Sequence, residues 1–83
     1  MTAADEFYKN AIALRGRIVA GRSNERPVQA WAAVARECAK ASDAMRRELG
    51  NRVHGRAQQA WFNNLDKLWW AAKAQVETLA RVG

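Results

Sequence analysis

The sequence contains one cysteine, one histidine and one proline in 83 residues. A single cysteine cannot form an intrachain disulfide, which excludes the small secreted proteins that disulfides hold together. Structural zinc usually takes four cysteine or histidine ligands, and Cys38 and His54 supply only two. We therefore expect no metal site and no cofactor, with Cys38 buried in a helix and His54 in a loop.

Long apolar runs are also missing. No stretch approaches the roughly 18–20 apolar residues of a membrane-spanning helix, and Asp5 and Glu6 stand where a secretory signal would be apolar. A helix lying on a membrane surface is disfavoured as well, because the basic residues do not line one polar face opposite an apolar one. These absences favour a cytoplasmic protein without a membrane partner.

Alanine is the most frequent residue, at 18 of 83 positions, and no alternating β-branched stretch is present. Because alanine favours helices and disfavours strands, the fold class is predicted to be all-α. Thr2 and Asp5 fit a capping box, and Gly21 and Pro27 bracket the first turn. One domain, residues 1–83, is expected, with helices at about 3–21, 27–49 and 53–81 in an antiparallel, up-down-up three-helix bundle. Gly55 leaves the start of the third helix open between Arg52 and Arg56.

The apolar residues follow helical repeats. The first helix carries two strips, and the second of them, Tyr8, Ile12 and Val19, predicts contact with a second neighbour. The third helix has an apolar arc from Ala57 to Leu79 that suits two helices, or one helix and another subunit, so a homodimer would form through this helix. The second helix has the clearest seam, with steps of three and four residues: Val28, Trp31, Ala35, Cys38, Ser42, Met45 and Leu49.

The net charge of +6 is concentrated at the two corners between the predicted helices. Residues 15–26 and residues 46–56 each hold four arginines and one glutamate, so each carries +3 and the other positions are balanced. Arginine is the preferred partner of phosphate and carboxylate groups. The candidate residues for binding nucleic acid or another acidic partner are Arg15, Arg17, Arg22, Arg26, Arg46, Arg47, Arg52 and Arg56.

Helix stability is a second explanation for most of these arginines. Five of them lie near the ends of the first two helices, where a cation interacts favourably with the helix dipole. Arg26, Arg52 and Arg56 lie at or before predicted helix starts, where a cation is mildly unfavourable. These three are the strongest candidates for facing an anion.

Four tryptophans are many for this length, and three of them fall on predicted apolar arcs. The fourth, Trp70, projects to the polar side of the third helix together with Asn63 and Lys73. Either the third helix packs on more sides than the periodicity indicates, or Trp70 anchors a protein–protein or self-association contact. Stacking of Trp70 on a nucleobase is a third alternative.

No catalytic arrangement is found. Residues 16–23 approach the phosphate-binding P-loop pattern, but Arg22 stands where lysine is required and no strand precedes the segment. Asp66 and Glu77 are about 16 Å apart along the third helix, which is too far for a pair of catalytic carboxylates. We therefore expect a protein that is not an enzyme.

The predicted function is binding. The leading hypothesis is that the arginine-rich corners bind an acidic partner, most of all nucleic acid. Contact with the backbone is favoured over reading of the bases, because no helix-turn-helix spacing is present. The alternative is a protein-binding regulator or inhibitor, of the kind found among small accessory proteins of bacteria, phages and plasmids. It would occlude a site on a larger protein or nucleic-acid-handling complex through Trp70 and surface arginines.

Overall fold

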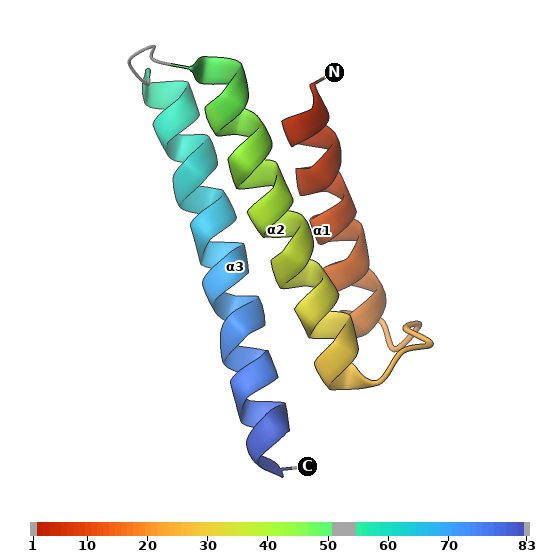
Figure 1. Ribbon diagram of the computed structural model, residues 1–83. Helices are drawn as coiled ribbons and strands as arrows, with labels where there is room; N and C mark the ends of the chain where they lie inside the picture. The colour runs from red at the N-terminus through yellow and green to blue at the C-terminus, as the bar shows by residue number, and fades with distance from the viewer. Residues whose placement is uncertain (1, 51–54, 83) are drawn as a thin grey trace.

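The computed structural model describes residues 2–50 and 55–82, and these ranges contain three α-helices and no strand. The helices are α1 (Ala3–Val19), α2 (Pro27–Leu49) and α3 (Arg56–Val82). Figure 1 shows them side by side, with α2 in the middle and each successive helix running opposite to the one before. The prediction of an all-α, three-helix fold is confirmed.

The ends of α1 are set by the residues that flank it. The Thr2 hydroxyl accepts a hydrogen bond from the Asp5 backbone N–H at 3.2 Å and donates one to the Asp5 carboxylate at 3.0 Å. After Val19 the chain turns at Gly21, whose φ of 72° lies in the left-handed region that suits glycine. The Arg22 N–H then bonds back to the Arg17 carbonyl at 2.8 Å, which closes the helix two residues earlier than predicted.

Helix α2 has the bounds that the sequence predicts. Pro27 occupies its first position, where the missing N–H is no loss, and Gly50 follows its last residue with a φ of 58°. Helix α3 begins at Arg56, the last residue of the range in which its start was left open. Arg52 and His54 lie outside the described residues.

The core is formed where α2 packs against both neighbours. Val34, Cys38 and Leu65 are its largest fully buried side chains. The predicted seam of α2 is buried at Ala35 and Cys38 and half-buried at its other positions. The buried surface of α2 is wider than that seam, because a middle helix contacts neighbours on two sides. Small residues dominate the remaining buried positions, namely Ala4, Ala11, Ala30, Ala35, Ala41 and Ala72.

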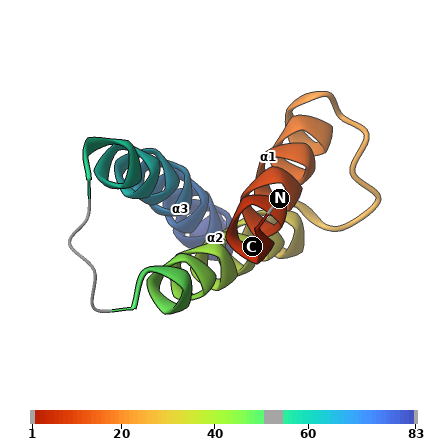
Figure 2. The same cartoon turned by 90° about the horizontal axis from the view of Figure 1, so that it is seen from above.

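Helices α1 and α3 pack against α2 and hardly against each other. Seen from above, α1 and α3 are inclined to each other (Figure 2). The Tyr8 and Trp61 rings, whose centroids are 5.5 Å apart, link the two helices. Beyond this link the second apolar strip of α1 is open, with Ile12 43% and Val19 75% exposed. The second neighbour predicted for α1 therefore covers only one end of that strip.

Candidate functional site

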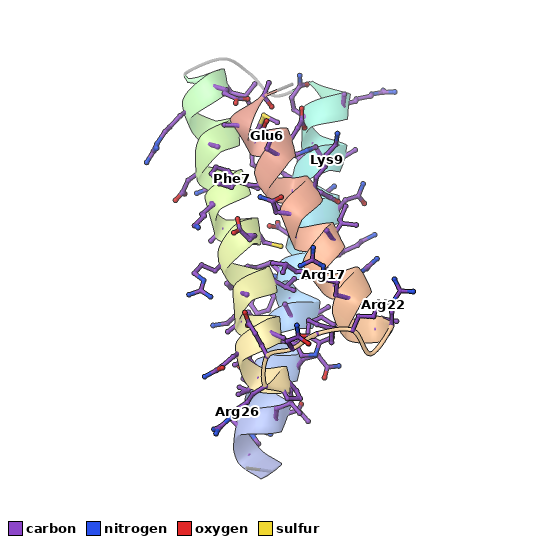
Figure 3. The ribbon with its side chains drawn as sticks, turned by 90° about the vertical axis from the view of Figure 1, so that its right-hand side faces the viewer. Glu6, Phe7, Lys9, Arg17, Arg22 and Arg26 are labelled. Atoms are coloured by element: carbon purple, nitrogen blue, oxygen red, sulfur yellow. The ribbon has the colours of Figure 1, made fainter. Side chains whose placement is uncertain are left out.

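The first corner contains four exposed arginines. Arg17 comes from the last turn of α1, Arg22 from the following turn, and Arg26 immediately precedes α2 (Figure 3). Arg17 and Arg22 border one hollow of about 180 Å³, together with Ser23, Asn24 and the carboxylate of Glu25. The corner therefore brings two guanidinium groups to one small concavity.

Arg15, the fourth arginine of this corner, belongs to a different surface. Two residues along a helix turn the side chain by about 200°, so Arg15 and Arg17 point away from one another. Arg15 borders a hollow between α1 and α3, with Ile12 and Lys67. The four arginines of this corner are close in sequence but thus lie on two different faces of the molecule.

The second corner contains Arg46 and Arg47 in the last turn of α2 and Arg56 at the first position of α3. All three are exposed. Arg46 borders a hollow of about 260 Å³ between α2 and α3 that also contains the carboxylates of Asp43 and Asp66. Arg47 and Arg56 are therefore better placed than Arg46 to meet an external anion.

None of the seven described corner arginines forms an ion pair or a side-chain hydrogen bond within residues 2–50 and 55–82. The helix dipole accounts for the basic last turns of α1 and α2. It does not account for Arg26 or Arg56, because a cation is unfavourable at the N-terminal end of a helix. Neither α2 nor α3 has an acidic residue in its first turn that would offset this charge. At both starts the arginine charge adds to the positive end of a helix, which favours an anion from outside.

The outer face of α2 carries two basic residues outside the corners, Arg36 and Lys40. Together with Arg47 they are spaced by four and seven residues and are exposed, on the side of α2 opposite Cys38. Of the neighbouring carboxylates, Glu37 is half-buried with its Oε1 3.7 Å from the Lys40 Nζ, and Asp43 is exposed. This stripe is not evident from the number of charged residues along the sequence, because that number does not distinguish exposed side chains from half-buried ones.

Trp70 is 65% exposed on α3. Its ring meets the ring of Trp69 nearly edge-on at 80°, with centroids 4.8 Å apart, and the Lys73 ammonium lies 5.4 Å from the centre of the Trp69 ring. Asn63 is exposed on the same helix and accepts a hydrogen bond from the Gln59 amide at 3.1 Å. No helix of the described chain covers Trp70, so this large apolar ring is available to a partner.

The described residues contain no cluster of histidine, cysteine, aspartate or glutamate side chains that could hold a metal ion. Burial, and secondly the nearby Glu37 carboxylate, raise the pKa of the Cys38 thiol to about 11, so the thiol is protonated and weakly nucleophilic near neutral pH. Within the described ranges, none of the helices is both apolar enough and long enough to cross a membrane.

Comparisons of the chain with protein-family models, with curated proteins and with solved structures give no match. The features that bear on function are thus the exposed arginines without ion pairs and the exposed apolar side chains.

Proposed function

We propose that this protein binds the phosphate backbone of nucleic acid through its arginine-rich corners and performs no catalysis. The observation that carries the proposal is that the seven described corner arginines are exposed and unpaired with carboxylates. An unpaired guanidinium can bind phosphate without first losing an intramolecular ion pair. The release of counterions from the nucleic acid then supplies most of the binding free energy.

The spacing of the corners supports a duplex as the partner. They lie at opposite ends of α2, whose 23 residues span about 34 Å. This length is close to one turn of duplex DNA, so Arg26 and Arg47 can reach phosphates about one turn apart. Arg36 adds positive charge on the outer face of α2 between them, whereas the charge of Lys40 is offset by Glu37, whose Oε1 lies 3.7 Å from the Lys40 Nζ. Contacts of this kind fix position on the backbone without reading bases.

The test is a salt titration with a fluorescein-labelled DNA duplex and the full chain, followed by fluorescence anisotropy. Between about 50 mM and about 200 mM salt, affinity is expected to fall steeply, with a slope of about 0.9 per phosphate contacted. Replacing Arg26 and Arg47 together by alanine should lower this slope by about two. The matched control, Lys73→Ala with Arg81→Ala, removes the same charge from α3 and should leave the slope unchanged.

Two outcomes would contradict the proposal. One is the absence of binding at the lowest salt concentration. The other is an equal loss of affinity in the corner variant and the α3 variant, since this would show attraction to net charge and not contact at the corners. A cytoplasmic location belongs to the same proposal, because a reduced compartment that contains nucleic acid suits a chain with one buried thiol.

The second candidate function is a protein-binding regulator or inhibitor that uses Trp70. It is favoured by the 65% exposure of that ring, since exposed tryptophans are over-represented among residues that dominate protein interfaces. A homodimer through α3 is one form of this contact. Sedimentation of the wild type and of Trp70→Ala tests it, with Gln59→Ala as a control on the same helix. A salt-resistant dimer that only Trp70→Ala dissociates would support it, and a monomeric wild type would exclude the dimer.

A further inference from the structure

A groove runs between α1 and α3 on the side of the molecule away from α2. It consists of two hollows, of about 300 Å³ and about 370 Å³, and Tyr8 borders both. We call this surface the α1–α3 groove. Its apolar lining is Tyr8, Ile12, Trp61, Leu68 and Ala71.

The dimensions of the α1–α3 groove match a short helix. Its lining extends along α1 from Asp5 to Arg15, and along α3 from Trp61 to Ala71, which is about 15 Å on each helix. About three turns of a further helix fit such a length. Two neighbouring helices with apolar side chains between them form a surface on which the apolar stripe of an amphipathic helix can pack.

The rim of the groove carries positive charge. Arg15 from α1 and Lys67 from α3 border the same hollow, and both are exposed and without an ion pair in the described part of the chain. Lys9 adds a third basic residue at the other hollow. The one acidic residue of the lining, Asp5, accepts the hydrogen bond of the Thr2 hydroxyl. A helix that enters the groove therefore meets net positive charge on both flanks.

We propose that the α1–α3 groove binds an amphipathic helix of a different protein, with acidic residues flanking its apolar stripe. The apolar lining supplies affinity, and Arg15 and Lys67 select acidic flanks over basic ones. A second copy of this chain is a poor occupant, because two molecules of net charge +6 repel and the groove itself is basic. The proposed docking is separate from nucleic-acid binding at the corners and shares only Arg15 with it.

Two synthetic peptides of about 16 residues test the proposal. Both carry leucine at steps of three and four residues; one has glutamate and the other lysine on the flanks. Fluorescence anisotropy with the full chain should show the glutamate peptide binding at least about tenfold more tightly. Methyl NMR should show a shift of the Ile12 signal on binding, whereas Ile18, which borders the corner hollow, should be unaffected.

Charge-reversal variants separate the groove from the overall charge. Arg15→Glu with Lys67→Glu should invert the preference, so that the lysine peptide binds more tightly. The matched control, Arg46→Glu with Arg47→Glu, makes the same change in net charge on α2, at residues that do not line the groove, and should change affinity by less than about twofold. All four residues are exposed, and circular dichroism checks that each variant is folded.

Several results would overturn the proposal. Equal losses in the two charge-reversal variants would show non-specific attraction. A wild-type dimer that Ile12→Glu dissociates would make a second copy the occupant. A DNA duplex that shifts the Ile12 methyl signal and displaces the glutamate peptide would make the groove part of the nucleic-acid surface. Loss of the corner contacts in the salt titration, by contrast, leaves the peptide result unaffected, so the two proposals fail separately.

Discussion

Helix α2 and the α1–α3 groove represent two kinds of packing in one small molecule. Where α1 and α3 meet α2, the buried residues are mostly alanines, which let helices approach closely. Where α1 and α3 face each other, the side chains are larger and incompletely covered, with Ile12 43% exposed and Tyr8 and Trp61 half-buried. Stability therefore comes from the two interfaces with α2, and the third side of the bundle is incompletely covered.

The largest expected effect on stability is that of Leu65→Ala, with Ile12→Ala as its comparison. Leu65 is 1% exposed in the core beside α2, so Leu65→Ala should lower the free energy of unfolding by about 2–5 kcal/mol through lost burial and a cavity. Ile12→Ala in the groove should cost less than about 1 kcal/mol, because the side chain is already partly hydrated. Urea denaturation of both variants measures the difference, and similar losses would refute the distinction between the two sides.

The buried thiol of Cys38 reports on how well the α2 interface excludes water. Its pKa is raised to about 11, from 9.0 for an unperturbed thiol. The unfolded chain therefore loses its thiol proton at lower pH than the folded chain does. The stability associated with the protonated thiol is complete below about pH 9 and should be lost as the pH rises to about 11, by about 2 kcal/mol.

Comparing Cys38→Ala with the wild type across this pH range isolates the thiol from other alkaline titrations. The variant is less stable at pH 7 because of the cavity, but its stability should fall less steeply between about pH 9 and about pH 11. Identical slopes would mean that water reaches Cys38 and that the interface with α2 is more open than the structure shows.

Two glycines allow a matched test of the connection between α1 and α2. Gly21 has a φ of 72°, so Gly21→Ala should destabilise the fold by about 1–2 kcal/mol through backbone strain. Gly16 lies within α1 with nothing within 4 Å of an added Cβ, so Gly16→Ala should stabilise it by about 0.5–1 kcal/mol. Thermal unfolding should move the two midpoints in opposite directions, and shifts of the same sign would contradict the turn geometry.

The smallest effect is expected for Trp70→Ala. The ring is 65% exposed and contacts Trp69 edge-on, so its loss should change the free energy of unfolding by less than about 1 kcal/mol. Chemical denaturation measures this value. A large loss would show that Trp70 supports the fold, and would remove the main reason to regard it as a contact for a partner.

The helices were predictable because local signals mark their ends. Thr2, Gly21, Pro27 and Gly50 each act through their own backbone or side chain, within a few residues of the helix end. The start of α3 was left open between Arg52 and Arg56, because the sequence before Arg56 offers no comparable capping residue. The exposure of Trp70 was left open, since periodicity gives the direction of a side chain and not what covers it.

The arrangement of the helices was less predictable than their positions. The repeat of Tyr8, Ile12 and Val19 shows that a face is apolar, but whether α3 covers it depends on how closely both helices approach α2. The candidate arginines were found by counting charge, and the seven that the structure describes are exposed. Their division between two faces, and the stripe of Arg36 and Lys40, required the spatial positions of the helices.

The central position of α2 also has a kinetic consequence. Nearly all tertiary contacts join helices that are consecutive in the chain, α1 with α2 and α2 with α3. Chains whose contacts are this local have little loop-closure entropy to overcome, and helical proteins of this type fold in microseconds to milliseconds. Each helical hairpin can form without waiting for the other, so the first is able to assemble during synthesis, before the last third of the chain has been made.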